Sequence, residues 1–524
     1  MKKVLFTLLK SDIEIIKSAR VINSYLQNNP HTEVSLLCYQ NSHEACSLVK
    51  NITNIYTIDS EKIATYLNGE IYPDVLACNV FGDNLKDVVA TQWDTVVNLS
   101  NDNVSAYLIS GLHAEEVIGS HIGNFGSVIT TNEWNTYLNS ICAKESFRTI
   151  SATDIKSNML LSPIDNSIEV LKIDNELAST ASVNFNKIRL SKGSGKTKVV
   201  GVSLSDGRGK EYIDTTSLVE LIDVLESSNE YKIVLISSGE EYEKEIVNSL
   251  NAEFNNSLIT ISAQKSALTA IMSNLDALVS CSNFALATAE ACETFTIELV
   301  NAGNQEILEK EGNFVIHTRG GFVDDIVYLL NTKYETVLPV HSTQTENSIY
   351  ETLRDDFGYF KSLVHGEVNL DQELNYHLKR CYNYSLMGYP VNHELLRNLK
   401  EKVPAERLMD YIETSKEEIT LYVKTLLGAL RSLKSTKETG QNTDKFIKSL
   451  DVLITSASDN TLASGALGLL DGRIENISST DVQDNINQIE KYLFELKSDL
   501  QQLTNIFGEL VSTPKRNKNI NQEA

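Results

Sequence analysis

A glycine-containing loop with two cationic side chains is the first part of the sequence that could do chemistry. Residues 205–210 read Ser-Asp-Gly-Arg-Gly-Lys. Arg208 and Lys210 could neutralise a diphosphate, Ser205 could add a hydroxyl, and the glycines would let the backbone approach a phosphate closely. A loop lysine exposed to solvent is an equally good explanation of these residues.

Asp12 is the second candidate. Residues 11–14 read Ser-Asp-Ile-Glu, which fits a capping box with Ser11 as the N-cap and Glu14 at the third helical position. An acidic residue in the first turn also interacts favourably with the helix dipole. A structural role therefore accounts for Asp12 without any chemistry.

A third segment looks like a phosphate-binding loop, but we reject that interpretation. Residues 193–197 read Gly-Ser-Gly-Lys-Thr, yet Leu190 stands where a Walker A motif needs its first glycine. The motif also needs a helix after it, whereas a strand is predicted from residue 198. We expect a hinge loop here.

The elements that would position these residues alternate between strand and helix. Residues 4–9 and 33–38 form short apolar runs typical of buried strands, and residues 15–26 place apolar side chains at helical spacing. Residues 198–204 and 231–237 begin a second alternation of the same kind. Two successive units of this type predict two parallel sheets covered on both faces, as in a pair of Rossmann-like domains.

Beyond residue 345 helical patterns dominate. Residues 481–511 repeat apolar side chains at intervals of three and four over about four heptads, which predicts a helix packed on a partner, with a coiled coil as one form of that packing. We therefore expect two Rossmann-like domains at residues 1–165 and 197–340, joined by a linker at residues 166–196. A helical extension at residues 345–512 and a flexible tail at residues 513–524 follow them.

Composition excludes several classes of protein. The 524 residues carry a formal net charge of −24, which disfavours binding to nucleic acid. The seven cysteines include no CxxC pair and the nine histidines no HxxxH pair, so we expect no metal site. The longest apolar runs are too short for a signal-peptide core or a transmembrane helix, and a cytoplasmic location is the expectation.

Residues 1–335 resemble glycosyltransferase family 9, the ADP-heptose:lipopolysaccharide heptosyltransferases. The likeness lies in residues 3–13, in the segment 93–119, in the strand, loop and helix of residues 201–225, and most clearly in residues 274–295. In the last stretch Asp-Ala-Leu-Val at 276–279 corresponds to the family's Ala-Asp-Leu-Val-Val strand.

This resemblance implies a GT-B fold and an inverting sugar transfer in bacterial glycan or lipopolysaccharide synthesis. Asp12 matches the general base that activates the acceptor hydroxyl, and Lys210 matches the lysine that pairs with the donor phosphate. The implied donor is an ADP-sugar or another nucleotide sugar, and the acceptor is a glycan or a protein. No cofactor or metal is needed if basic groups stabilise the leaving diphosphate.

The sequence departs from the family pattern where the donor would bind. The family has Asn-Asp-Ser-Gly-Pro and then a histidine, but residues 281–285 read Cys-Ser-Asn-Phe-Ala and Ala287 replaces the histidine. Phe284 places a ring where a backbone needs to approach a diphosphate. Ser282 and Asn283 either retain contacts with the donor or only cap the next helix.

Two functions therefore remain open. The first is a heptosyltransferase-like enzyme with Asp12 as catalytic base and Ser205, Arg208, Lys210, Ser282 and Asn283 as donor ligands. The second is a catalytically inactive GT-B scaffold that forms homo-oligomers or docks a protein partner through residues 345–512. The register of the whole domains, Asp12 and Lys210 support the first, which we adopt as the prediction. The altered donor motif, the net charge of −24 and the long helical extension support the second as the alternative.

Overall fold

The computed structural model describes most of the chain, namely residues 1–69, 72–123, 126–140, 149–191, 197–204, 215–228, 230–239, 241–255, 257–281, 283–301, 310–319, 321–338, 346–366, 370–459 and 461–512. Two compact units make up the chain. The first comprises Met1–Ser100, Gly111–Val117 and Leu160–Glu367, and the second comprises Asn101–Ser110, Ile118–Met159 and Val368–Ala524. Each unit is thus built from segments that are far apart in the sequence.

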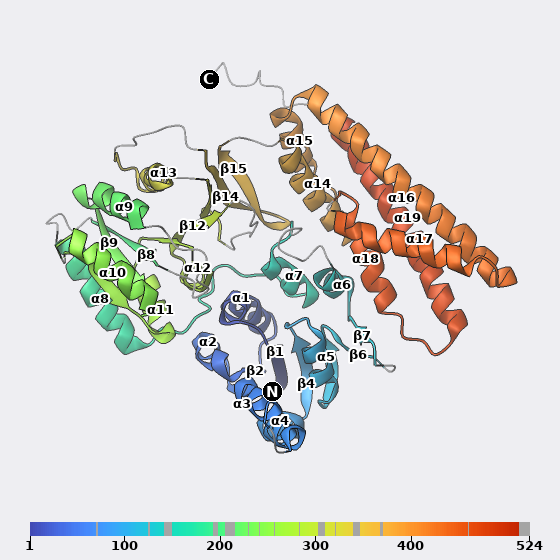
Figure 1. The fold of residues 1–524 in the computed structure, drawn as a ribbon, viewed down its shortest axis with the longest axis horizontal. Helices are drawn as coiled ribbons and strands as arrows, with labels where there is room; N and C mark the ends of the chain where they lie inside the picture. The colour runs from blue at the N-terminus through green and yellow to red at the C-terminus, as the bar shows by residue number, and fades with distance from the viewer. Residues whose placement is uncertain are drawn as a thin grey trace. The chain divides into compact units, whose positions relative to one another are not determined.

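The first unit contains a five-stranded sheet in the order β3-β2-β1-β4-β5 (Figure 1). Its strands are β1 (Lys2–Leu8), β2 (Thr32–Tyr39), β3 (Asn54–Ile58), β4 (Trp93–Asn98) and β5 (Ala114–Ile118). The pairs β1–β2, β1–β4 and β2–β3 are parallel. Val4, Leu5 and Phe6 of the central strand have no solvent exposure, which explains the unbroken apolar run there.

Four helices accompany this sheet: α1 (Asp12–Asn28), α2 (His43–Leu48), α3 (Ser60–Leu67) and α4 (Pro73–Ala90). Ile15, Ile16 and Ile22 on α1 are buried, as their helical spacing predicts. Ser11 occupies the predicted N-cap position, but its side chain makes no capping hydrogen bond. The capping hydrogen bond predicted for Ser11 is therefore wrong, although the helix begins where it was predicted.

The first unit also contains an eight-stranded sheet in the order β10-β9-β8-β11-β12-β13-β14-β15. Its parallel strands are β8 (Lys198–Ser203), β9 (Tyr231–Ser237), β10 (Ile259–Ser262), β11 (Ala277–Ser280), β12 (Phe295–Asn301) and β13 (Phe314–Thr318). The accompanying helices are α8 (Asn175–Leu190), α9 (Thr215–Ser227), α10 (Glu241–Glu253), α11 (Lys265–Met272), α12 (Asn283–Ala291) and α13 (Val323–Tyr334). The predicted fold class, a GT-B-like pair of Rossmann-like sheets followed by helices, is confirmed.

Two boundaries differ from the sequence prediction. The strands β14 (Ser348–Asp355) and β15 (Gly358–His365) form an antiparallel hairpin on the edge of the second sheet, so the helical part begins at Leu370 and not at 345. Most side chains of this edge hairpin are partly exposed, and it lacks a continuous apolar run. Within the predicted linker 166–196, α8 forms a regular helix.

The second unit combines an inserted segment with the C-terminal helices. The insertion contains α5 (Asn103–Ser110), β6 (His121–Ile122), β7 (Val128–Ile129), α6 (Glu133–Asn139) and α7 (Ala152–Met159). The C-terminal helices are α14 (Leu370–Leu386), α15 (His393–Lys402), α16 (Ala405–Thr439), α17 (Thr443–Thr455), α18 (Ser464–Glu475) and α19 (Val482–Ser512). In the described part of the chain, no helix is long and apolar enough to cross a bilayer.

The helix predicted at 481–511 is α19, and its packing partners belong to the same chain. Its buried face includes Leu493, Leu500, Leu503 and Leu510 and joins a shared core with α14, α15, α16 and α18. The apolar repeat seen in the sequence is thereby explained within one chain. A coiled coil with a second chain stays a prediction.

Candidate active site

Both sheets have a topological switch point, the place where the strand order reverses and where open α/β sheets bind ligands. In the first sheet the chain runs from β1 outward through β2 and β3 and then returns to β4, beside β1. In the second it runs from β8 through β9 and β10 and returns to β11, beside β8. The segments after β1, β4, β8 and β11 are therefore the expected places for a site.

Asp12 follows β1 at the first switch point. The turns after β1 and β4 are tied together there, because the Ser100 hydroxyl accepts from the Leu9 N–H at 2.7 Å and donates to the Thr7 carbonyl at 3.1 Å. Asp12 is the first residue of α1 and its side chain is 17% exposed. The fold thus holds a nearly buried carboxylate at the carboxyl edge of the sheet.

Lys265 forms an ion pair with Asp12. It is the first residue of α11, directly after β10 of the second sheet, so the pair connects the carboxyl edges of the two sheets. A cation at the N-terminus of a helix is disfavoured by the helix dipole. The contact with Asp12 compensates for this, and the Lys265 ammonium also lies 5.9 Å from the centre of the Phe284 ring on α12.

A second acid from the first sheet's helices supports the same turn of α11. Glu44 on α2 accepts a hydrogen bond from the Ser266 N–H at 2.9 Å. Cys46, also on α2, has a pKa raised far above its usual range by a hydrogen bond with Cys38, by burial and by the Asp12 charge. Because thiolates and not thiols act as nucleophiles, Cys46 is inert beside Asp12.

Of the predicted site residues, only Asp12 has a described side chain. Ser205, Arg208, Lys210 and Ser282 lie outside the described residues, as does the segment 193–196 of the rejected phosphate loop. Asn283 begins α12, and only its backbone is described. By chain position, Ser205, Arg208 and Lys210 lie between β8 and α9, and Ser282 lies between β11 and α12. Both segments flank the second switch point.

Sequence reasoning missed Lys265. A signal was present, since lysine is an unusual residue for the first position of a helix that follows a strand. Its partner Asp12 is 253 residues away, so the pair itself could not be recognised without the fold.

The helices α1 and α12 pack directly on each other. Arg20 on α1 is 8% exposed and pairs with Glu293, just after α12, at 2.8 Å. The cavity lined by Ile16 on α1 and Ala287 on α12 has only about 20 Å³. A nucleotide sugar needs a site of several hundred Å³, so this cavity between the described parts of the two helices is too small to be one.

Known proteins provide limited comparisons. No protein family and no curated protein matches this chain by sequence. A glycosyl transferase family 9 structure from Veillonella parvula DSM 2008 is similar at 14% identity and a TM-score of 0.46, over 66% of this chain and 92% of that one. E. coli heptosyltransferase WaaC with ADP-2-deoxy-2-fluoro heptose is similar at 11% identity and 0.45, over 63% and 99%.

E. coli ADP-heptose lps heptosyltransferase II is similar at 12% identity and a TM-score of 0.41, over 64% of this chain and 99% of that one. These scores and identities are low, and the fold assignment rests on the sheet order of this chain itself.

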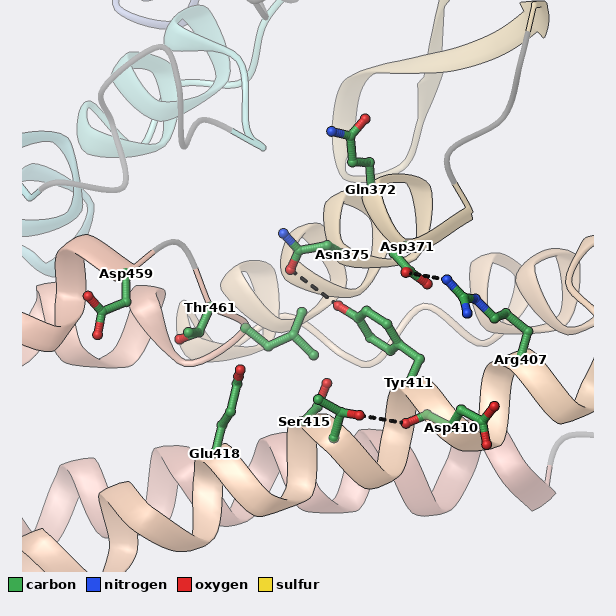
Figure 2. Close-up of a pocket in the computed structure, with 12 residues that line it drawn as sticks. Asp371, Gln372, Asn375, Arg407, Asp410, Tyr411, Ser415, Glu418, Asp459 and Thr461 are labelled. Atoms are coloured by element: carbon green, nitrogen blue, oxygen red, sulfur yellow. Dashed lines mark hydrogen bonds and ion pairs between the residues drawn. The ribbon is translucent and has the colours of Figure 1, made fainter.

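A separate pocket of about 470 Å³ lies in the second unit, lined by α14, α16 and residues near Asp459 (Figure 2). Arg407 pairs with Asp371 at 2.5 Å, and Tyr411 donates to Asn375 at 3.3 Å. Figure 2 draws both interactions as dashed lines. Burial, together with the charge of Asp459, raises the pKa of Glu418. The surplus of carboxyl groups in this pocket opposes binding of a diphosphate.

Proposed function

We propose that this protein is a heptosyltransferase-like glycosyltransferase that moves a sugar from a nucleoside-diphosphate donor to a hydroxyl of a glycan or protein acceptor. The observation that carries the proposal is the Asp12–Lys265 ion pair between the carboxyl edges of the two sheets. It brings a candidate base and a candidate diphosphate ligand together beside the first switch point. The residues predicted to bind the donor lie, by chain position, beside the second switch point.

The reaction needs both kinds of group. The acceptor oxygen forms a bond to the anomeric carbon as the bond from that carbon to the diphosphate oxygen breaks, so configuration inverts. Asp12 takes the hydroxyl proton. The nucleoside diphosphate leaves with added negative charge, which Arg208, Lys210, Lys265 and the N-terminus of α12 would stabilise. No metal takes part in this scheme.

Lys265 would make donor binding precede proton transfer to Asp12. Without donor, its ammonium neutralises the Asp12 carboxylate, which cannot accept a proton without losing that partner. A diphosphate carries more negative charge than one carboxylate and competes for the lysine. Donor binding would then release Asp12 for the acceptor hydroxyl.

The direct packing of α1 on α12 favours the second candidate, an inactive GT-B scaffold. A donor bound between these helices would have to separate them, and Phe284 occupies the second position of α12. The scaffold would oligomerise or dock a partner through residues 345–512. Because the apolar face of α19 is already buried in its own unit, such docking would use other surfaces of those helices.

Release of nucleoside diphosphate distinguishes the two candidates. The full chain is incubated with ADP-heptose and other nucleotide sugars, with and without glycan acceptors. Glycosyl transfer predicts release that Asp12→Asn reduces by about 10²–10⁴-fold, the usual contribution of a general base. Asp74→Asn, a change to a similar first-turn acid on α4, should have no effect. No release with any donor would support the scaffold.

A further inference from the structure

A second pocket, of about 180 Å³, lies within the second unit. Its lining comes from the inserted segment, chiefly Asn101, Asn103, Ser120 and Asn139, and from Glu475 and Asn476 at the end of α18. Among the described residues that line it there is no lysine, arginine or histidine. The C-terminal helices therefore complete a pocket that the insertion alone would leave open.

The floor of this pocket is a fixed network of amides and one hydroxyl. Ser120 is 1% exposed, and its hydroxyl lies 3.0 Å from the Asn101 Oδ1 and 2.9 Å from the Asn139 Nδ2. Asn101 also donates to the Leu138 carbonyl at 3.1 Å and has a left-handed backbone (φ 55°), which asparagine tolerates. These bonds set the direction of the polar groups in advance.

The wall contributed by α18 is held equally firmly. The Asn476 Oδ1 accepts from the Thr130 N–H at 2.9 Å, and the Asn476 Nδ2 donates to the Thr130 hydroxyl at 2.5 Å. Gly472 lies against α6 so closely that a β-carbon there would stand 2.7 Å from the Thr136 methyl group. A glycine is thus needed for α18 to approach the insertion and close the pocket.

Two rim groups keep free hydrogen-bonding capacity. Neither the Asn103 amide nor the Glu475 carboxyl forms a hydrogen bond or an ion pair with the described residues. An amide both donates and accepts, and a carboxylate accepts twice. Together with the amides of the floor, these two side chains offer both donors and acceptors, which is what binding to adjacent hydroxyl groups requires.

The charge of the pocket argues against the other ligands of this size. The lack of basic residues disfavours a phosphate. The Asp102 carboxylate accepts a hydrogen bond from the Ser105 N–H at 2.8 Å, so it already binds the first turn of α5. Among the described residues no group of three or more His, Cys, Asp or Glu side chains could hold a metal ion. Burial and Asp471 raise the pKa of Glu475, which weakens its hold on a cation.

We propose that this pocket binds one neutral, hydroxyl-rich sugar ring, with Asn103 and Glu475 contacting its hydroxyls over the Asn101–Ser120–Asn139 floor. The proposal does not depend on Asp12 or on a donor nucleotide. It assigns the helical extension a role in glycan recognition, because α18 supplies one wall of the site.

Saturation-transfer NMR on the full chain tests this with methyl glycosides of glucose, galactose, mannose and N-acetylglucosamine. We expect at least one to bind with a dissociation constant of about 1–10 mM, a weak affinity of roughly 3–4 kcal/mol. Asn103→Ala and Glu475→Ala should each weaken that binding about fivefold or more. Glu417→Ala, a change to an exposed acid on α16, should leave it unchanged.

Three results would overturn the proposal. One is no binding of any glycoside at concentrations of about 50 mM, well above the expected dissociation constants. Another is binding that Asn103→Ala and Glu475→Ala leave intact while both variants keep the wild-type melting temperature. The third is stronger binding of spermidine or inorganic phosphate that Glu475→Ala alters, since the pocket would then be an ion site. Loss of nucleotide-sugar turnover alone would bear on the proposed transfer and not on this pocket.

Discussion

At Asp12 the structure shows a different structural role from the capping box that the sequence suggested. A capping role predicts that the residues around the start of α1 bind the helix's own N–H groups, but the Ser11 side chain makes no such bond. The Asp12 carboxylate instead pairs with Lys265 from the other sheet. The helix dipole still favours an acid here, so Asp12 has both a structural partner and the position that a base would need.

Replacing Lys265 measures the strength of that pair. We expect Lys265→Met to lower the free energy of unfolding by about 1 kcal/mol, since the pair is partly exposed and the variant leaves Asp12 without its partner. High salt should reduce the difference because it screens exposed charges. Denaturant titration would check this, with exposed Lys62→Met as the control. Equal losses in both variants would show that the pair contributes nothing specific.

His317 on β13 predicts a dependence of stability on pH. Burial, with a smaller effect of Lys361, lowers its pKa from 6.5 to about 4. The folded state therefore holds the neutral ring, and its contribution to stability is complete above pH 6.5 and lost as the pH falls towards 4. The loss amounts to at most about 3 kcal/mol.

His317→Phe should flatten the unfolding free energy between pH 6.5 and 4, whereas a change to exposed His43 should not. Urea titrations at several pH values would measure this. If the unfolding free energy of His317→Phe fell between pH 6.5 and 4 as steeply as that of the wild type, other groups would be the cause of the fall.

At the scale of elements, buried parallel strands were the most predictable part. The strand β9 matches its expected range 231–237, and β8 ends one residue before the end of its expected range 198–204, because a strand covered on both faces must be apolar throughout. The hairpin β14–β15 was missed because most of its side chains stay at least partly exposed. The helix α8 was missed for a similar reason, since Phe185 is its one buried residue.

The helix α19 gives a prediction of its own. Leu503 is fully buried in the helical core, and Val511 near the end of the same helix is 44% exposed. Leu503→Ala should cost about 2–5 kcal/mol by leaving a cavity, whereas Val511→Ala should change the free energy of unfolding by under about 0.5 kcal/mol. Thermal or urea unfolding of the full chain checks both. Similar small effects would mean that α19 does not pack as described.

At the scale of the whole molecule, the division into units follows contacts and not chain order. The inserted residues 118–159 belong with helices more than 200 residues away. Tyr137 is fully buried and accepts from the Asn383 side chain at 3.0 Å, and Trp134 contacts the Tyr384 ring at a centroid distance of 6.1 Å. The sequence could not indicate this grouping, because the apolar pattern of a segment does not show which other segment it packs against.

A truncated chain tests that grouping. Ending the protein at Gly366 keeps both sheets but removes the helices that cover Trp134 and Tyr137. We expect a red shift in tryptophan fluorescence, binding of hydrophobic dyes and a lower melting temperature, because aromatic side chains become exposed. A truncated chain with unshifted fluorescence and unchanged melting would contradict the discontinuous unit.

The roles of the predicted site residues stay predictions, and among these residues only Asp12 has a described side chain. Asp12 and the donor loop came from a resemblance in sequence, and the switch points of the two sheets agree with their positions along the chain. Lys265 and Glu44 required the fold, since each acts on a residue more than 200 positions away.

The most direct test of the account is a calorimetric titration of the full-length protein with ADP and ADP-heptose, repeated on Lys210→Ala and on the control Lys62→Ala. We predict a micromolar dissociation constant that Lys210→Ala weakens tenfold or more, about 1.4 kcal/mol, and that the control leaves unchanged. An absence of heat up to about millimolar ligand would contradict a donor site at the second switch point and would leave the scaffold as the function of this fold.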